Sequence, residues 1–212
     1  MPELTAIVSA IRRCRVCVTA PRGEPLPHEP RPVLRASETA RLAICGQAPG
    51  TRVHRSGKPF TDPSGDRLRS WLNMPADVFY DEARVAIVPM GFCFPGHDAK
   101  GGDLPPRREC AAQWHGDLFA AMPQVELVLA VGAYAHAFHL GAARGKTLQE
   151  TMLNWRAHLE APRSPRVFPL PHPSWRNNAW LQKNPWFEAD LLPALRCEVG
   201  KVLSASLRGV EY

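Results

Sequence analysis

The sequence predicts one α/β domain with a three-layer αβα architecture around a central four-stranded parallel sheet. Four short and almost continuously apolar segments carry this prediction, at residues 41–45, 84–88, 125–131 and 167–170. Segments with helical apolar spacing lie between them, and this alternation favours a parallel sheet covered by helices on both faces. The length of 212 residues fits a single domain over residues 1–212.

The N-terminal half supplies the first strand and two helices. Residues 3–13 have apolar residues at helical spacing, and residues 18–40 are rich in Pro and Arg, which indicates a surface excursion. The strand at 41–45 ends at a Gly-containing turn. A helix is expected over 64–73, with Ser64 as its N-cap.

The C-terminal half supplies three strands with clear stop signals. Pro89 follows the second strand, Gly132 the third and Pro171 the fourth. Apolar residues at helical spacing predict the helices of this half at 106–121, 133–140 and about 185–207.

Composition and charge narrow the class of protein. A hydrophobic fraction of 45% and a charged fraction of 22% exclude a disordered chain and a coiled coil. No run of 18 apolar residues occurs, and residues 1–11 lack the layout of a secretory signal, so a cytoplasmic location is expected. The protein is expected to be a monomer. The 26 Lys and Arg residues outnumber the 20 Asp and Glu residues, which suits a polyanionic partner.

Three of the four strands end in unusual residues. These are Gly-Gln-Ala-Pro-Gly at 46–50, a Pro/Gly-rich loop with a cysteine at 89–96, and Pro-His-Pro-Ser-Trp-Arg-Asn-Asn at 171–178. The carboxyl ends of parallel strands lie at one edge of a sheet, where α/β proteins form their sites. We therefore expect these three loops to converge on one crevice.

Two of the motifs have both a structural and a functional interpretation. The turn at 46–50 exposes backbone N–H groups to a close ligand, or is an ordinary turn after a strand. Phe60 lies in a Gly/Pro-containing loop, where its ring can stack on a flat base or cover the core.

The loop after the fourth strand contains the polar groups. His172 comes directly after this strand, where it can stabilise a developing anion. Ser174 and Arg176 are residue types that contact phosphate groups.

Four of the six cysteines have spacing that suits a metal centre. Cys14 and Cys17 form a Cys-x-x-Cys pair, and Cys93 and Cys110 lie far downstream. Four thiolates can hold zinc or a [4Fe–4S] cluster. Zinc ribbons prefer a second Cys-x-x-Cys pair, which favours the cluster. The other two cysteines, Cys45 and Cys197, are flanked by apolar residues.

The ordered set of motifs over about residues 10–195 resembles the uracil-DNA glycosylase superfamily, and most closely the iron–sulfur (family 4/5-like) glycosylases of bacteria and archaea. The resemblance implies a DNA glycosylase that hydrolyses the N-glycosidic bond of uracil, or of a related deaminated or damaged base, in base excision repair. It implies that Cys14, Cys17, Cys93 and Cys110 bind the [4Fe–4S] cluster.

The resemblance also implies the roles of individual site residues. The loop with Gly46, Gln47 and Ala48 holds the water and the base, and the ring of Phe60 stacks on the flipped base. His172 stabilises negative charge on uracil O2. Substrate contacts are expected from Met90, Ser174 and Asn177, and insertion into the DNA duplex from Trp175 and Arg176.

The sequence departs from the family pattern at two positions. Gln47 and Ala48 carry no charge where several branches have a carboxylate or Asn that positions the attacking water. Pro89 occupies the position of the Asn that reads uracil. The groups that the sequence offers in place of the missing carboxylate and asparagine are Asp62, Asn177, Asn178 and the backbone of residues 89–93. Asp62 has the alternative role of a cap or Asx-turn before Pro63.

These departures leave two alternatives open. The first is a DNA-binding homologue that has lost or altered its catalytic activity. The second is a covalent uracil-binding branch in which a histidine attacks the sugar, and His54 is the residue available for this.

Overall fold

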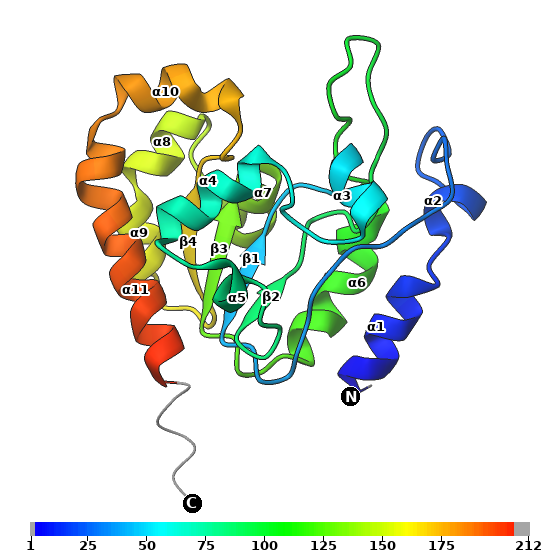
Figure 1. The fold of residues 1–212 in the computed structure, drawn as a ribbon, viewed down its shortest axis with the longest axis horizontal. Helices are drawn as coiled ribbons and strands as arrows, with labels where there is room; N and C mark the ends of the chain where they lie inside the picture. Colours follow the sequence, from blue (N-terminus) through cyan, green and yellow to red (C-terminus); the bar gives the residue numbers. More distant parts are fainter. Residues whose placement is uncertain (1–2, 206–212) are drawn as a thin grey trace, which may run out of the picture.

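In the computed structural model, which describes residues 3–205, a four-stranded parallel sheet lies at the centre with helices around it (Figure 1). The strands are β1 (Leu42–Cys45), β2 (Val85–Ile87), β3 (Leu127–Val131) and β4 (Arg166–Leu170), in the order β2-β1-β3-β4. All neighbouring strands pair in parallel, which confirms the fold class predicted from the apolar segments.

The two faces of the sheet bury different side chains because successive residues of a strand point to opposite faces. Leu42 and Ile44 of β1 belong to one hydrophobic cluster, and Ala43 and Cys45 belong to another. All four side chains are fully buried. Because both faces are covered, each strand is apolar at nearly every position.

Two helical layers supply the covering side chains. One cluster contains Leu68, Trp155 and Leu195 from three of the helices, and the other contains Ile11 and Leu118 from two more. The α-helices are α1 (Leu4–Arg12), α2 (Val16–Thr19), α3 (Thr51–Ser56), α4 (Pro63–Leu72), α5 (Ala76–Phe79), α6 (Arg108–Ala120), α7 (Ala133–Leu140), α8 (Leu148–Leu153), α9 (Trp155–Glu160), α10 (Asn178–Lys183) and α11 (Leu192–Ala205).

Three expectations need correction. Ser64 is not the N-cap of α4: the helix begins at Pro63, and the Asp62 carboxylate accepts a hydrogen bond from the Gly65 N–H at 3.1 Å. Residues 18–40 are not wholly a surface excursion, because the backbone of Arg35 exchanges two hydrogen bonds with that of Ile87 at the free edge of β2.

The third correction concerns the expected C-terminal helix. A π-helical turn over Phe187–Leu191 precedes α11, and the expected end at residue 207 lies outside the described residues. Within residues 3–205, none of the helices has the length and apolar character needed to cross a membrane.

A buried histidine ties α7 to two strands. The Nε2 of His136 lies 3.0 Å from the Ala130 carbonyl oxygen and 2.9 Å from that of Leu170, so its N–H donates to the ends of both β3 and β4. Burial lowers the pKa of His136 to about 4, and burial likewise lowers the pKa of His115, on α6, to about 4.

These two histidines predict a loss of stability in acid. The unfolded chain protonates histidine near pH 6.5, whereas the folded protein resists protonation until about pH 4. The free energy of unfolding therefore has its full value above pH 6.5 and falls as the pH drops towards 4. The loss at pH 5 is up to about 2 kcal/mol per histidine. Urea unfolding at pH 7.5 and pH 5 measures this. His136→Gln keeps an N–H donor and should reduce the difference, and an equal difference in both proteins contradicts the assignment to His136.

Candidate active site

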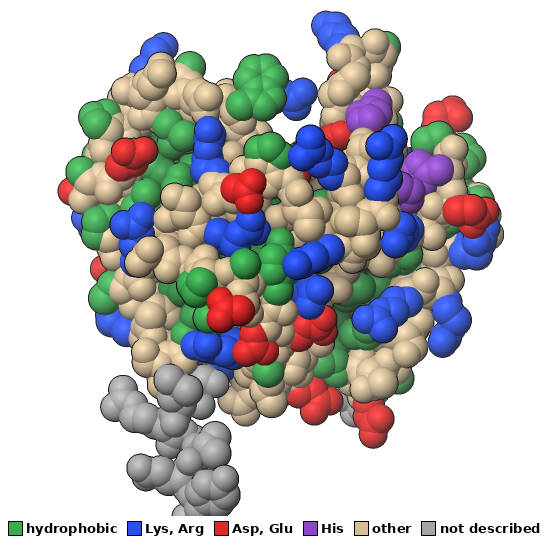
Figure 2. Space-filling view, in the orientation of Figure 1, with side chains coloured by type: hydrophobic (Ala, Val, Ile, Leu, Met, Phe, Trp, Pro, Cys, Tyr) green, Lys and Arg blue, Asp and Glu red, His purple; other side chains and the backbone are tan. Residues whose placement is uncertain are grey.

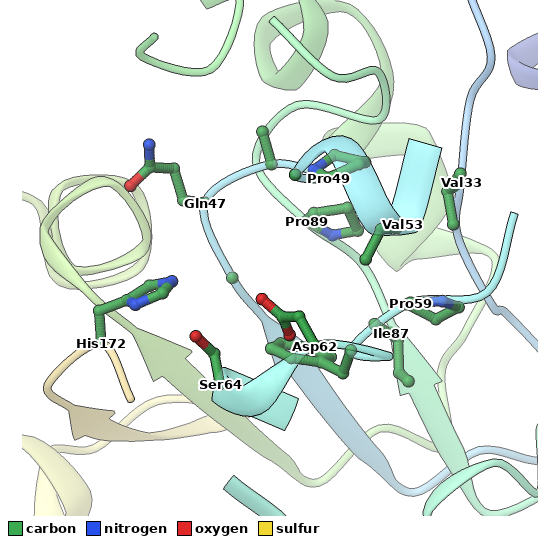
Figure 3. A pocket seen from close by; sticks show the side chains of 14 residues that line it. Val33, Gln47, Pro49, Val53, Pro59, Asp62, Ser64, Ile87, Pro89 and His172 are labelled. Carbon is green, nitrogen blue, oxygen red and sulfur yellow. The ribbon is translucent and has the colours of Figure 1, made fainter. Parts of the chain in front are cut away.

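A cavity of about 490 Å³ lies at the carboxyl ends of the strands (Figure 3). We call it the inner cavity. Its walls come from segments far apart in the sequence: Val33, the turn at 46–50, Val53, residues 59–64, the end of β2 and His172. A wider space of about 1,630 Å³, the outer groove, shares six of these residues and continues along Tyr134 and residues 172–177. The expected convergence of the turn at 46–50 with the loop after β4 is thus present.

The turn after β1 is fixed to the loop after β2. The Gly46 carbonyl accepts a hydrogen bond from the Met90 N–H at 2.9 Å, and the Gln47 carbonyl accepts one from the Gly91 N–H at 3.0 Å. A Cβ on residue 46 would lie 3.3 Å from the Cζ of Phe60. Glycine at this position therefore lets the aromatic ring approach the turn and close one side of the inner cavity.

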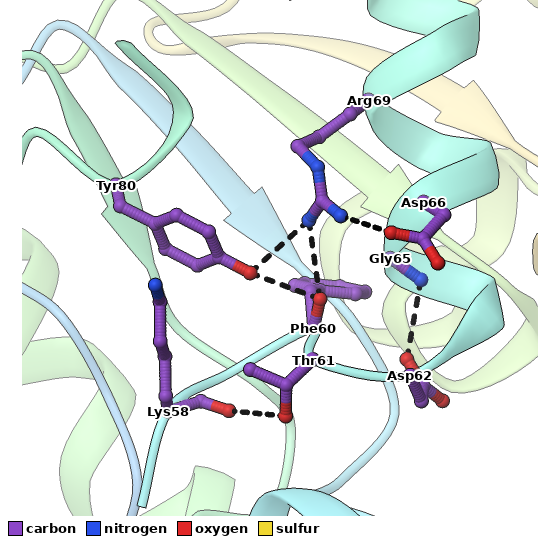
Figure 4. Close-up of polar contacts among 8 residues, drawn as sticks. All are labelled: Lys58, Phe60, Thr61, Asp62, Gly65, Asp66, Arg69 and Tyr80. Atoms are coloured by element: carbon purple, nitrogen blue, oxygen red, sulfur yellow. Dashed lines mark hydrogen bonds and ion pairs between the residues drawn. The ribbon is translucent and has the colours of Figure 1, made fainter. Parts of the chain in front are cut away.

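Phe60 is held in an unusual backbone conformation. Its φ of 54° lies in the left-handed region, which non-glycine residues rarely adopt. Its carbonyl oxygen accepts hydrogen bonds from the Tyr80 hydroxyl at 3.0 Å and from Arg69 Nη1 at 3.2 Å (Figure 4). A Cβ on Gly65 would lie 1.9 Å from the same oxygen, so no side chain fits there. Strain of this kind persists only where the surroundings impose it, and here it fixes the direction of the ring.

The Phe60 ring covers part of the core, as one of its two interpretations predicts, while stacking on a base stays a prediction. One side contacts Phe79 edge to face, with ring centroids 5.9 Å apart, and packs on the core. The half-buried ring also lines the inner cavity.

Asp62 and Ser64 place polar groups in the inner cavity from the start of α4. In Figure 3 the Asp62 carboxylate and the Ser64 hydroxyl point into it. Asp62 also caps α4, which confirms the capping interpretation, while its role in the reaction stays a prediction. Ser64, considered only as a cap, is a cavity residue that the sequence analysis missed.

His172 has a defined tautomer and orientation. The Ser174 backbone N–H donates to its Nδ1 at 3.2 Å, so the neutral ring carries its proton on Nε2. Burial lowers the pKa of His172, Asp62 and Asp103 oppose this, and Arg176 adds to it. Gly132, with φ of 85°, lies against the ring, since a Cβ there would lie 3.4 Å from the His172 Cβ. The result is a neutral imidazole with an N–H available to the cavity.

The rest of the loop after β4 borders the outer groove. Asn177 Nδ2 donates to the His172 carbonyl at 2.7 Å, so this side chain braces the loop as well as lining the groove with Ser174. Trp175, 74% exposed, and Arg176 also line the groove. Figure 2 shows Lys and Arg side chains around the notch at the top of the molecule.

Two residues lie elsewhere than the sequence suggested. Met90 is 3% exposed and packs in the core, so it lines neither the inner cavity nor the outer groove, whereas Pro89 lines the inner cavity. His54 lines neither the inner cavity nor the outer groove. Its ring packs on those of His28 and Phe94, at centroid distances of 4.4 and 5.9 Å. This placement is unfavourable to covalent attack by His54.

Sequence reasoning also missed two groove residues. Asp103 lies on a hairpin between β2 and α6, and Tyr134 lies in the first turn of α7, after Gly132. Neither belongs to a recognisable motif, although the position of Tyr134 directly after a strand is a signal that could have found it.

The four expected cysteine ligands meet around a separate cavity of about 250 Å³. All four thiols are free, and Cys17, Cys93 and Cys110 are buried. Burial raises the pKa of Cys93 and of Cys110 to about 12, and the Phe92 N–H donates to the Cys110 Sγ at 3.4 Å. Among the described residues, no three His, Cys, Asp or Glu side chains are close enough together to hold a metal ion.

Residues 35–196 match the family model described as the uracil DNA glycosylase superfamily. Membership of this superfamily implies DNA glycosylase activity in general, with DNA as the partner. The match begins just before β1 and ends within α11, so it contains the whole sheet and every segment that lines the inner cavity except Val33. This chain belongs to the uracil DNA glycosylase superfamily.

Proposed function

We propose that the protein is a monofunctional DNA glycosylase that removes uracil, or a related deaminated or damaged base, by hydrolysing the N-glycosidic bond. The observation that carries this proposal is the junction of the inner cavity with the outer groove, where Phe60 and the N–H of His172 face the same space. Excision from a panel of duplexes, each with one modified base, tests it.

The two spaces suit the two parts of a flipped nucleotide. An enzyme that acts on a base in a duplex must first take the base out of the stack. The damaged strand follows the outer groove, with Trp175 filling the gap left in the duplex and Arg176 contacting phosphate. The base enters the inner cavity and stacks on Phe60. The glycine at position 46 leaves room for the Phe60 ring beside the turn after β1.

His172 stabilises the leaving base. When the glycosidic bond breaks, negative charge develops on the base and positive charge on the sugar. A neutral imidazole whose Nδ1 is already bonded donates its Nε2–H to the base oxygen. Gln47 lies on the same side of the inner cavity as His172 (Figure 3) and orients the attacking water.

Asp62 and Ser64 read the base in the absence of the family's asparagine. Pro89 lines the inner cavity but has no polar side chain. The edge of uracil presents an N–H between two carbonyl oxygens. The carboxylate of Asp62 accepts from that N–H, and the Ser64 hydroxyl donates to a neighbouring oxygen. Because a hydroxyl rotates freely, this pair also accommodates other deaminated bases.

The four cysteines are proposed to hold a [4Fe–4S] cluster. A four-iron cluster holds its thiolates further apart than a single ion does, because iron and sulfide lie between them. The placement of all four cysteines around one cavity supports a shared metal centre, and the resemblance to the iron–sulfur glycosylases favours a cluster over zinc. The cluster would join the N-terminal segment, the loop with Cys93 and α6, and this loop continues from Pro89 at the inner cavity. The proposed role of the [4Fe–4S] cluster is structural.

The second candidate is a DNA-binding homologue without catalysis. The observation that favours it is the uncharged turn at 46–50 combined with Pro89. In that case the wild-type protein binds damaged duplex but excises no base of the panel.

Phe60→Ala is expected to weaken the binding or the excision of damaged DNA by about ten- to a hundred-fold, because stacking on a base contributes ~1–3 kcal/mol. Binding to undamaged duplex should change little, since that DNA inserts no base. Filter binding and single-turnover excision measure both effects. Phe138→Ala is the matched control, because this ring is 46% exposed and lies outside the inner cavity and the outer groove. An equal loss on damaged and undamaged DNA would show that Phe60 only packs on the core.

A further inference from the structure

Asp103 is a carboxylate in the outer groove that no motif assigns. It comes from the hairpin of residues 96–104, which projects beyond the sheet beside α3 (Figure 1). Its Oδ2 lies 3.3 Å from the position that a Cβ on Gly50 would occupy, so the carboxylate lies against the turn after β1. It also lies close enough to His172 to oppose the lowering of that residue's pKa. A carboxylate is thus present beside the uncharged turn, supplied by another loop.

The hairpin holds this side chain in place. Its two strands are joined by hydrogen bonds from the Asp98 N–H to the Gly102 carbonyl at 2.8 Å and from the Leu104 N–H to the Gly96 carbonyl at 2.9 Å. The His97 ring links the hairpin to α3, with Nε2 3.1 Å from Thr51 Oγ1 on α3 and 3.3 Å from Asp103 Oδ1 on the hairpin. The position of Asp103 therefore follows from contacts with α3 as well as from the hairpin itself.

Asp62 and Asp103 flank His172 but face different parts of a bound nucleotide. Asp62 lines the inner cavity, where the base lies, as well as the outer groove, and uses one oxygen to cap α4. Asp103 lines the outer groove and not the inner cavity. Because the sugar lies where the strand enters the inner cavity, Asp103 faces the sugar.

We propose that Asp103 is the catalytic carboxylate of the hydrolysis, acting on the sugar side; this rests on the proposed glycosylase function. The oxygen of a water molecule bonds to C1′ as the C1′–N bond breaks, and the bonding electron pair leaves with the base. The Asp103 carboxylate accepts the proton that the water loses. Its negative charge also stabilises the positive charge that develops on the sugar, while the base leaves as an anion bonded to His172.

A purely structural role for Asp103 predicts different results. The carboxylate lies beside Gly50, the N-cap of the short helix α3, where a negative charge stabilises a helix. In that role, Asp103→Asn lowers the melting temperature and leaves the charge preference of the site unchanged. The test must therefore measure charge recognition separately from stability.

The experiment compares two duplexes that cannot be hydrolysed. One carries a pyrrolidine abasic site, whose protonated nitrogen mimics the cationic sugar, and the other carries the neutral tetrahydrofuran abasic site. We expect Asp103→Asn to reduce the preference for the cationic duplex by about ten-fold or more. The control Asp98→Asn lies on the same hairpin and keeps the Oδ1 that accepts from the N–H groups of Lys100 and Gly102, so its preference should equal that of the wild type.

Single-turnover excision completes the test. Asp103→Asn should slow excision by about 10²–10⁴-fold, the usual contribution of a general base. Wild-type excision and an unchanged charge preference in Asp103→Asn would overturn the inference. If the wild type excises nothing, the proposed function fails, and the same duplexes still show whether Asp103 recognises a cationic sugar.

Discussion

His172→Ala is expected to slow base excision by about 10²–10³-fold while leaving DNA affinity nearly unchanged. The turn after β1 carries no charge, so hydrolysis depends strongly on stabilising the leaving base. The His172 ring has one nitrogen bonded to the Ser174 N–H and lies against Gly132, so its free N–H is directed before substrate binds. Such a preorganised donor in a closed site contributes most when charge develops.

A conservative variant separates this role from packing. His172→Gln retains an N–H donor and should recover part of the lost rate, whereas a packing role predicts similar losses in both variants. Single-turnover excision gives the rate, and binding to a duplex with an uncleavable base analogue gives the affinity. Wild-type turnover by His172→Ala on every base of the panel would exclude His172 as the stabilising group.

Cys93→Ala is expected to give colourless and poorly folding protein. The metal centre supplies folding free energy, and the four cysteines join three segments that lie far apart in the sequence. The hydrophobic cluster around this site contains only Cys17, Leu26 and Cys93, with Val18 packed against it. Without the [4Fe–4S] cluster, residues 14–26 have little apolar area to hold them against the loop after β2, although α1 stays packed in the core through Ile7 and Ile11.

Two cysteine controls test the specificity of this effect. Cys45 is buried in the sheet and Cys197 is exposed on α11, and neither lines the cysteine cavity. Replacement of either by Ala should leave the visible absorption and the iron and sulfide content unchanged. Stoichiometric zinc in colourless wild-type protein would contradict the cluster.

The sheet could be predicted from the sequence because strands buried on both faces are apolar at every position. Leu42 to Cys45 have no polar residue, and no helix of useful length fits between Arg41 and the turn at 46. The parallel direction of the strands also places their carboxyl ends at one edge, which predicted the position of the site. The short helices α3, α5, α8 and α9 could not be predicted, because four to six residues show too little periodicity.

Side-chain direction after a strand was the least predictable part of the site. Pro89 and Met90 are neighbours in the sequence, but the Pro89 side chain faces the inner cavity and the Met90 side chain faces the core. An error of one residue in the predicted register therefore assigns the wrong side chain to the cavity. The start of α4 was wrongly assigned to Ser64, although the sequence contains the signal: Pro favours the first position of a helix and Asp the cap before it, as Pro63 and Asp62 show. The position of Asp103 in the outer groove depends on how the hairpin of residues 96–104 packs on α3. No local sequence pattern predicts that packing.

The parallel register has a consequence for biosynthesis. Leu42 pairs with Val85 and with Leu127, and Leu127 pairs with Arg166, so every pair of neighbouring strands awaits the synthesis of a distant segment. Such non-local pairing is slow, and no hairpin forms early to anchor the sheet. His172 follows the last strand to leave the ribosome. A nascent chain that already contains Phe60 therefore has no working site, and enzymatic activity reports that translation and folding of the whole sheet are complete.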